Sequence, residues 1–422
     1  MSNQFKSVDW LKGANIYEVN IRQYTKEGTF ESFQKHLPRL KEMGVKALWL
    51  MPVTPISVEI RQGTLGSYYA CSSYTQINPE FGNFDDFKNL VNEIHSLGMK
   101  IMIDWVANHT GWGHEWTKQH PGWYMKDGKG NFTEENNWHD VIDLNYDVKE
   151  MRLAMIDAMK FWINDFDIDG FRCDMAHLVP LDFWKQARTA CDAVKPLLWL
   201  AECEMVEYHD VFDITYAWEW MHITEKVVRK ESTVNDIYNE LHKYSQYPKD
   251  CYKLFFTANH DENSWNGTEY EKYGNAAKAF AVFTCTWNNA VPLIYSGQEL
   301  PNYKRLKFFE KDEIEWTENI ALNDFYKTLL ALHETKVVCD GETFNLPTND
   351  SYAMAFVRKK DEEILLVLLN FSGDEKIKIV VEHDWIEGKF QNIFSGLQYQ
   401  FNSKEEFELM DFDYLVYKKV KC

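Results

Sequence analysis

The sequence lacks a surplus of basic residues. Its 422 residues include 45 Lys and Arg against 65 Asp and Glu, which gives a formal net charge of −20 at pH 7. Nucleic acids and anionic membrane surfaces attract proteins through clustered cations, and the Lys and Arg of this chain are scattered. We therefore expect neither nucleic acid nor a membrane as a partner.

The sequence also lacks a disulfide framework and a membrane-spanning run. Its eight cysteines form no CxxC pair and follow no regular spacing, which is typical of buried free thiols in a reducing compartment. No apolar run approaches the length that crosses a bilayer, and the first six residues, MSNQFK, contain no apolar signal region. We expect a cytoplasmic protein, unless a signal segment was removed from a longer chain.

Aromatic residues, by contrast, are abundant. They make up 15% of the chain, with 16 Trp and 22 Tyr, and hydrophobic residues as a whole make up 45%. Two interpretations fit this composition. The rings either fill a large core or form stacking platforms for flat, weakly polar ligands such as sugars.

Eight short apolar runs alternate with helical patterns and predict a parallel α/β sheet. The predicted strands are residues 14–20, 45–51, 100–106, 168–176, 197–201, 211–217, 254–258 and 291–296. Helices are predicted over residues 30–43, 84–97 and 151–166, and the first two end at Gly44 and Gly98.

Polar side chains follow the ends of several of these strands. They are Asp104 and residues 108–109 after the third strand, Arg172 and Asp174 at the fourth, Glu202 at the fifth and residues 259–261 at the seventh. Chemistry at the carboxyl ends of strands is typical of a (β/α)₈ barrel. The sequence therefore predicts a TIM barrel with its functional groups at one rim.

The domain boundaries follow from where this alternation breaks. We predict a catalytic barrel of residues 1–110 and 147–340, with a small inserted domain, residues 111–146, after the third strand. From about Ser351 onward, β-hairpin patterns with turn signals replace the helices. We therefore predict a C-terminal all-β sandwich domain of residues 341–422.

Two carboxylates at this rim have different surroundings in the sequence. Arg172 and Asp174 are two residues apart on a strand, so they share a face, and the cation favours an ionised Asp174. Asp174 is then either a nucleophile or one half of a structural ion pair. Glu202 ends an apolar strand with no adjacent cation, and burial raises the pKa of such a carboxyl. One ionised carboxylate and one acid suffice to cleave a glycosidic bond with retention.

The sequence resembles the α-amylase family of glycoside hydrolases, family thirteen. The matching motifs are residues 104–109 (DWVANH), 170–174 (GFRCD), Glu202 and residues 256–261 (FTANHD), with 47–52 (ALWLMP), 66–69 (GSYY), 78–82 (NPEFG) and 141–145 (VIDLN) in support. The resemblance covers roughly residues 13–316. It implies Asp174 as nucleophile, Glu202 as general acid and base, and Asp261 as stabiliser of the transition state.

The resemblance also implies the reaction and the groups that bind the substrate. The reaction is retaining hydrolysis of α-1,4-linked glucans or malto-oligosaccharides through a covalent glycosyl-aspartate, with no cofactor needed for the chemistry. The expected binding residues are Arg172, which holds Asp174 ionised, Asp104, which braces Arg172, His109 and His260, which bind hydroxyls, and Tyr69, which stacks on the sugar.

The chain departs from the family pattern just after Asp174. His177-Leu178 stand where many α-amylases have Lys-His, so we expect His177 to contact the substrate and the specificity to differ there. The same departure weakens the structural calcium site that the resemblance implies, which would use a backbone carbonyl at this point with Asn108 and Asp143. The alternative is a hydrogen bond at Asn108 without metal.

Three other functions are compatible with parts of the sequence. A transglycosylase, debranching enzyme or isomerase on the same scaffold differs in loops whose position the sequence does not reveal. A non-catalytic sugar-binding homologue would lack one or more of the three carboxylates. A metal-dependent barrel hydrolase would use zinc ligands drawn from His109, Asp174, Glu202, His260 and Asp261.

Overall fold

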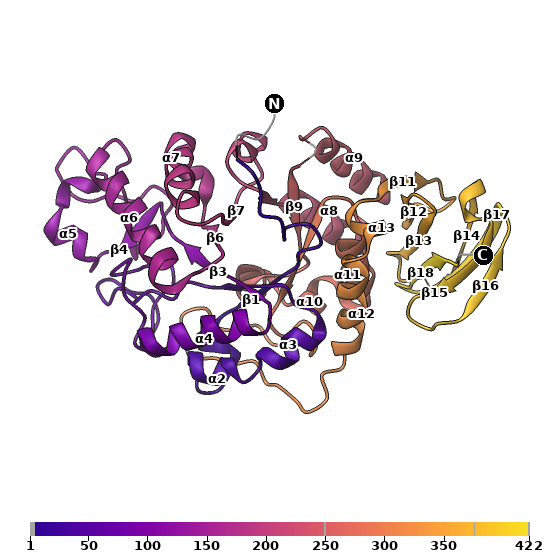
Figure 1. The fold of residues 1–422 in the computed structure, drawn as a ribbon, viewed down its shortest axis with the longest axis horizontal. Helices are drawn as coiled ribbons and strands as arrows, with labels where there is room; N and C mark the ends of the chain where they lie inside the picture. The colour runs from indigo at the N-terminus through magenta and orange to yellow at the C-terminus, as the bar shows by residue number, and fades with distance from the viewer. Residues whose placement is uncertain (1–4, 249, 375, 421–422) are drawn as a thin grey trace. The chain divides into compact units, whose positions relative to one another are not determined.

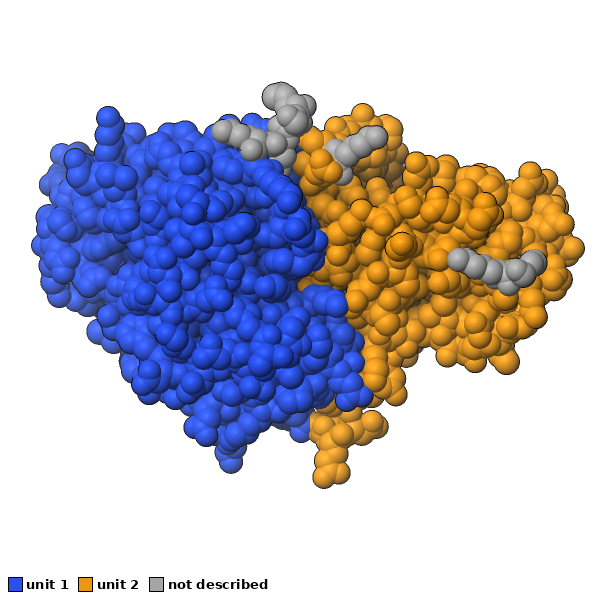
Figure 2. Space-filling view, in the orientation of Figure 1, with its two compact units in different colours: residues 1–11, 16–216, 304–316 blue, residues 12–15, 217–303, 317–422 orange. Residues whose placement is uncertain are grey.

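The structure is a computed structural model that describes residues 5–248, 250–374 and 376–420. The chain divides into two compact units, which Figure 2 shows in different colours. Unit 1 comprises residues 1–11, 16–216 and 304–316, and unit 2 comprises residues 12–15, 217–303 and 317–422.

Eight strands form a closed barrel, which confirms the (β/α)₈ prediction. They are β1 (Ile16–Val19), β2 (Ala47–Leu50), β3 (Lys100–Trp105), β6 (Gly170–Cys173), β7 (Leu198–Ala201), β8 (Ile214–Tyr216), β9 (Tyr252–Phe255) and β10 (Ala290–Tyr295). Figure 1 labels β1, β3, β6, β7 and β9 among them. Each predicted strand has its counterpart, because short apolar runs buried on both faces are typical of parallel strands. Strand β9 begins two residues before the predicted run.

Thirteen α-helical segments accompany the strands in the described part of the chain. They are α1 (Ile21–Tyr24), α2 (Phe30–Gln34), α3 (Leu37–Met43), α4 (Phe84–Ser96), α5 (Glu115–Gln119), α6 (Lys149–Phe166), α7 (Leu181–Asp192), α8 (Trp218–Val228), α9 (Val234–Ser245), α10 (Glu269–Tyr273), α11 (Ala277–Thr286), α12 (Asn323–His333) and α13 (Lys336–Cys339). Helix α4 illustrates why they form, since Asn83 and Asp86 close a capping box at its start.

The single helix predicted over residues 30–43 is wrong. The chain forms two helices there, α2 and α3, with Pro38 in the first turn of α3. Proline has no backbone N–H to donate into a preceding turn, so it is tolerated at a helix start and interrupts a helix interior. The predicted end at Gly44 is confirmed, because this residue caps α3 in the left-handed conformation with φ 104°.

The segment inserted after β3 is built on a small antiparallel sheet. Strands β4 (His109–Gly111) and β5 (Val141–Asp143) pair with each other, and α5 lies between them in the sequence. The register sets His109 opposite Asp143. The insertion thus leaves and re-enters the barrel at neighbouring points, next to the residues that follow β3.

The C-terminal part of unit 2 is all-β, as predicted. One sheet has the order β11 (Glu342–Leu346), β12 (Ala353–Lys360), β13 (Glu363–Asn370), β18 (Tyr414–Lys419), β15 (Gly388–Asn392) and β16 (Gln398–Phe401), and β14 (Lys376–Glu382) pairs with β17 (Lys404–Met410). Alternate residues of β14 are buried. One apolar cluster contains side chains of both sheets, which is the arrangement of a sandwich.

The described cysteines and helices are compatible with the absence of a disulfide framework and of a membrane-spanning run in the sequence. Seven cysteines are free, and the eighth, Cys422, lies outside the described residues. No helix in the described part of the chain is both long enough and apolar enough to span a bilayer. The first four residues, on which part of the signal-segment prediction rests, also lie outside the described ranges.

Gly170 at the start of β6 offers a test of how tightly the barrel strands pack. A Cβ added there would lie 2.5 Å from the carbonyl oxygen of Leu198 on β7. We expect Gly170→Ala to lower the free energy of unfolding by about 2 kcal/mol, because it overpacks a buried strand pair. Gly128→Ala is the control, since nothing lies within 4 Å of its added Cβ. Urea titration measures both, and equal midpoints would contradict the prediction.

Candidate active site

One buried guanidinium pairs with three carboxylates at the carboxyl ends of β3, β6 and β7. Arg172 Nη1 lies 2.9 Å from Asp104 Oδ1 and 2.9 Å from Asp174 Oδ1. Its Nη2 lies 2.9 Å from Glu202 Oε2. The ion pair that we expected between Asp104 and Arg172 is therefore present, and both predicted reactive carboxylates contact the same cation.

Strand register explains why these side chains meet. Asp104 on β3 is opposite Arg172 on β6, and Cys173 on β6 is opposite Ala201 on β7. Residues that are opposite each other in parallel strands face the same side, as do residues two apart on one strand. Asp174 and Glu202 consequently follow their strands at the same level, on the face that carries Arg172.

Glu202 has no cation beside it in the sequence, but it contacts one in the structure. Arg172 is 30 positions away in the sequence but lies on the neighbouring strand, and its long planar side chain reaches both carboxylates. Proximity along the sequence could not reveal this contact. Arg172 alone therefore does not make Asp174 the ionised carboxylate and Glu202 the acid.

The pKa of Asp174 moves in the direction opposite to the prediction. Burial raises the pKa of this carboxyl well above its usual range, and Arg172 opposes that shift. The carboxylates of Glu202 and Asp104 raise it further. The effect of Arg172 thus has the predicted sign but is outweighed, first by burial and then by the neighbouring carboxylates of Glu202 and Asp104.

Two aromatic residues that are not among the predicted site residues complete the surroundings of Arg172. The Tyr216 hydroxyl accepts a hydrogen bond from Arg172 Nε at 3.2 Å. The Trp49 ring lies 4.9 Å from the guanidinium carbon, and its Nε1–H donates to Asp104 Oδ2 at 3.1 Å. Trp49 lies in the supporting motif of residues 47–52, whereas only the strand register could have identified Tyr216.

A strained turn connects Asp174 and Glu202, the two carboxylates that are predicted to react. Met175, directly after Asp174, has left-handed backbone angles of φ 40° and ψ 46°. Its N–H donates to Glu202 Oε2 at 2.8 Å. Non-glycine residues rarely adopt this conformation, and those that do cluster at functional sites. A methionine in the sequence gives no indication of such a turn.

Tyr69 and His109, two of the predicted binding residues, are buried beside this cluster. The Tyr69 hydroxyl donates to Asp104 Oδ2 at 3.0 Å, whereas the neighbouring Tyr68 ring lies against Arg22, 4.2 Å from its guanidinium carbon. Burial lowers the pKa of His109 to about 4, although a hydrogen bond with the Tyr69 backbone opposes this shift. The imidazole is therefore neutral at pH 7.

His177 differs from the other predicted binding residues. It lies on the 3₁₀ turn Ala176–Leu178 that follows Asp174, and it is exposed. Its backbone carbonyl accepts a hydrogen bond from the Tyr208 hydroxyl at 3.3 Å. The side chain is thus placed where the solvent reaches it, rather than within the buried cluster.

The remaining two predicted residues belong to unit 2 and follow β9. His260 Nε2 lies 3.3 Å from Asp261 Oδ2, and 39% of the Asp261 side chain is exposed while His260 is buried. Directly after Asp261 the chain forms a π-helical turn, Glu262–Asn266. Such turns are frequent at functional sites.

The residues that the resemblance implies for calcium do not fit a calcium site. Asn108 Nδ2 donates to Asp143 Oδ1 at 3.2 Å, and Asp143 Oδ2 accepts from the Glu135 N–H at 2.9 Å. The His177 backbone carbonyl accepts a hydrogen bond from the Tyr208 hydroxyl. Calcium takes about six to eight oxygen ligands, and both carboxylate oxygens of Asp143 and the carbonyl of His177 already accept hydrogen bonds within the protein. We propose that Asn108 and Asp143 hold the inserted segment through a hydrogen bond without metal.

This proposal predicts how stability responds to calcium. Excess EDTA and millimolar calcium should both leave the melting temperature unchanged, because the Asn108 amide already satisfies Asp143. Asp143→Ala should lower the melting temperature equally with and without calcium, since it removes the acceptor of two hydrogen bonds. Differential scanning fluorimetry measures both. A calcium-dependent rise that Asp143→Ala abolishes would reject the proposal.

The comparisons with known proteins agree with this geometry. A maltogenic α-amylase, AmyB, from Thermotoga neapolitana has a solved structure with a TM-score of 0.90 and 30% identity, over 98% of this chain and 100% of that one. An α-amylase structure from Lactobacillus plantarum gives a TM-score of 0.88 and 28% identity, over 97% and 99% of the two chains.

Curated sequences give the same result at lower identity. Alpha-amylase MalA of Haloarcula japonica is 24% identical over 86% of this chain, which spans only 56% of that relative's length. Alpha-amylase 3 of Dictyoglomus thermophilum is 23% identical, over 87% of this chain and 86% of the relative. The family model for the α-amylase catalytic domain matches residues 11–363. The chain therefore belongs to the α-amylase family of glycoside hydrolases.

Proposed function

We propose that the protein is a retaining glycoside hydrolase that acts on α-1,4-linked glucans or malto-oligosaccharides. The observation that supports this most is the pair Asp174 and Glu202, held on adjacent strands by one buried guanidinium. Family membership adds the substrate class, because AmyB of Thermotoga neapolitana is described as a maltogenic α-amylase. Retention requires two closely spaced carboxyl groups with different roles.

The first step forms a covalent intermediate. An oxygen of Asp174 attacks the anomeric carbon while the protonated Glu202 donates its proton to the glycosidic oxygen, so that the leaving sugar departs with a new hydroxyl. The cluster around Arg172 is suited to hold this proton, since it contains three carboxyl groups and one cation. Arg172 lies against both carboxylates and opposes the repulsion between them.

The second step reverses these roles. The Glu202 carboxylate takes a proton from a water molecule, whose oxygen attacks the anomeric carbon and releases Asp174. The Met175 N–H remains on Glu202 and orients its carboxylate. The product keeps the α configuration because each step inverts the anomeric carbon once.

The other predicted residues have supporting roles in this proposal. Asp261 grips the 2- and 3-hydroxyls of the reacting sugar and strengthens these bonds in the transition state. The neutral His109, with His260, binds hydroxyls, and Tyr69 stacks on the ring. His177, which is exposed, contacts the acceptor side of the substrate.

Two alternative functions compete with this proposal. A transglycosylase would transfer the glycosyl group from Asp174 to a sugar hydroxyl instead of water, and a relative from Burkholderia pseudomallei is named a maltosyltransferase.

A metal-dependent hydrolase is disfavoured, because Arg172 lies between the carboxylates that would have to bind the metal. Among the described residues no three His, Cys, Asp or Glu side chains are arranged to hold a metal.

We also propose a cytoplasmic location. A relative from Bacillus subtilis, 25% identical over 81% of this chain, is named an intracellular maltogenic amylase. The free thiols of the described cysteines are compatible with a reducing compartment.

Substitution of the two reactive carboxylates separates their roles. Glu202→Gln should lower kcat/KM on maltoheptaose by about 10²–10⁴-fold, the usual contribution of a general acid. It should spare an activated aryl maltoside far more, because that leaving group needs no proton. Asp174→Asn should abolish the turnover of both. Glu207→Gln, which changes an exposed carboxylate after the same strand, is the control. Equal losses in both variants on the aryl maltoside would show that the roles are wrongly assigned.

The stereochemistry of the product tests the mechanism directly. Wild-type protein with maltoheptaose should release the α-anomer first, as seen by time-resolved ¹H NMR before mutarotation. Initial release of the β-anomer would refute the covalent glycosyl-aspartate. Products longer than the substrate would favour transglycosylation over hydrolysis.

The charge balance around Arg172 predicts the pH dependence of kcat/KM. Asp174 must be ionised to attack, and its raised pKa means that activity is lost as the pH falls through a value above the usual Asp pKa of about 3.9. Asp104→Asn removes one negative charge beside Asp174, so it should move the acidic limb of the profile to lower pH. An unmoved limb, or one displaced to higher pH, would contradict this electrostatic interpretation.

A further inference from the structure

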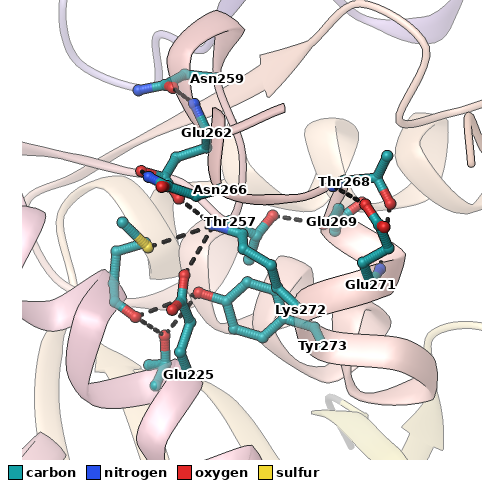
Figure 3. A network of polar contacts seen from close by, with 12 residues as sticks. Glu225, Thr257, Asn259, Glu262, Asn266, Thr268, Glu269, Glu271, Lys272 and Tyr273 are labelled. Atoms are coloured by element: carbon teal, nitrogen blue, oxygen red, sulfur yellow. Dashed lines mark hydrogen bonds and ion pairs between the residues drawn. The ribbon is translucent and has the colours of Figure 1, made fainter. Parts of the chain in front are cut away.

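Unit 2 contains a buried ion cluster that joins α8, α10 and the turn after β9 (Figure 3). Lys272 of α10 places its Nζ 2.5 Å from Glu262 Oε2 and 2.8 Å from Glu225 Oε1 of α8. Only 5% of the Lys272 and Glu262 side chains and 14% of the Glu225 side chain are exposed. Glu262 is the residue that follows Asp261, so this cluster is tied to the predicted site through a single peptide bond.

Glu262 is fixed by more than its ion pair. Its backbone N–H donates to Asn259 Oδ1 at 2.8 Å, and its Oε1 accepts from Asn266 Nδ2 at 2.8 Å. Its backbone carbonyl accepts from the Gly267 N–H, which closes the π-helical turn. The residues on either side of His260 and Asp261 are therefore held to each other.

A second set of contacts holds the segment that precedes Asp261. The Thr257 hydroxyl donates to the Glu269 carboxylate and accepts from Gln298 Nε2 at 3.1 Å. Gln298 Oε1 in turn accepts from the Tyr295 N–H at the end of β10. Burial raises the pKa of Glu269. Residues 257–262 are thus anchored at both ends by buried polar groups of α10 and of the segment after β10.

Stability alone does not account for charged groups at these positions. Replacing a buried ion pair by apolar residues of similar volume is often neutral or stabilising, because the two charges lose their hydration. Such pairs can instead impose one particular geometry. Here the geometry that is imposed belongs to the turn that carries Asp261.

We propose that Lys272 is a positioning residue for catalysis. By holding Glu262 and Glu225 together it fixes the turn after β9, and so it orients the Asp261 carboxylate toward the reacting sugar. The inference rests on the proposed role of Asp261. It assigns a function to a lysine that lies in none of the motifs of the resemblance and that would contact no substrate.

The main variant is Lys272→Met, which keeps the length of the side chain and removes its charge. We expect kcat on maltoheptaose to fall about 10–100-fold with KM nearly unchanged, because a misplaced group of the site costs transition-state interactions. Lys272→Arg, which restores the cation, should recover most of this loss. Far-UV circular dichroism and a melting curve show that each variant is folded at the assay temperature.

The matched control is a lysine of unit 1. Lys195 pairs with Asp169 at 3.0 Å and with Asp167 at 2.6 Å, at the amino end of β6. Lys195→Met should lower the melting temperature without changing kcat. It separates the general loss of an ion pair from the loss of this particular one.

A double-mutant cycle with Asp261→Asn tests whether Lys272 acts through Asp261. If it does, Lys272→Met should reduce kcat in the wild type and have little further effect in the Asp261→Asn background. Additive losses, or a folded Lys272→Met with wild-type kcat, would overturn the proposal. Should Lys272→Met not fold, Glu262→Gln provides the same test, because it weakens the ion pair and keeps the contact with Asn266. A wild type that turns over no maltoheptaose would refute the proposed function instead.

Discussion

The buried guanidinium of Arg172 is the interaction on which the candidate site depends. Its two terminal nitrogens, Nη1 and Nη2, lie 2.9 Å from oxygens of three carboxylates. Its third nitrogen, Nε, donates a hydrogen bond to the Tyr216 hydroxyl. Three buried carboxyl groups around one cation leave the cluster short of positive charge, so a proton is retained there more readily than on isolated carboxyl groups. In the proposed mechanism the site both donates and accepts a proton, and a shortage of positive charge favours this, whereas an evenly paired cluster would hold every carboxylate ionised.

In each unit one buried cation pairs with several carboxylates, but the cation differs between the units. In unit 1, planar Arg172 satisfies Asp104, Asp174 and Glu202 from fixed directions. In unit 2, Lys272 joins Glu262 and Glu225, and neither belongs to the predicted reactive set. A guanidinium suits contacts with several carboxylates because its donors are rigidly spaced, and an ammonium suits a compact anchor. Arg172 therefore sets the charge of the carboxylate cluster in unit 1, and Lys272 is proposed to set the geometry of the turn that carries Asp261 in unit 2.

The sequence predicted the architecture well because parallel barrel strands are short, apolar and separated by helices. For the same reason it predicted that Asp174, Glu202 and Arg172 lie together at one rim of the barrel. It failed where the cause lies between strands or in the backbone. The contact of Arg172 with Glu202 depends on the β6–β7 register, and the turn at Met175 depends on a conformation that methionine does not signal. Pro38 marks the start of α3, so the sequence does contain a signal for two helices in place of the single one predicted over residues 30–43.

The left-handed turn at Met175 has a consequence for observing the protein at work. Its N–H points at Glu202 Oε2, so the amide is hydrogen-bonded to the group proposed to gain and lose a proton in every cycle. A bond from N–H to a charged carboxylate is shorter and stronger than one to a neutral carboxyl. The chemical shift of the Met175 ¹⁵N–¹H resonance should therefore change when Glu202 gains or loses a proton. It makes the acid–base cycle readable in solution without any change to the residues that perform it.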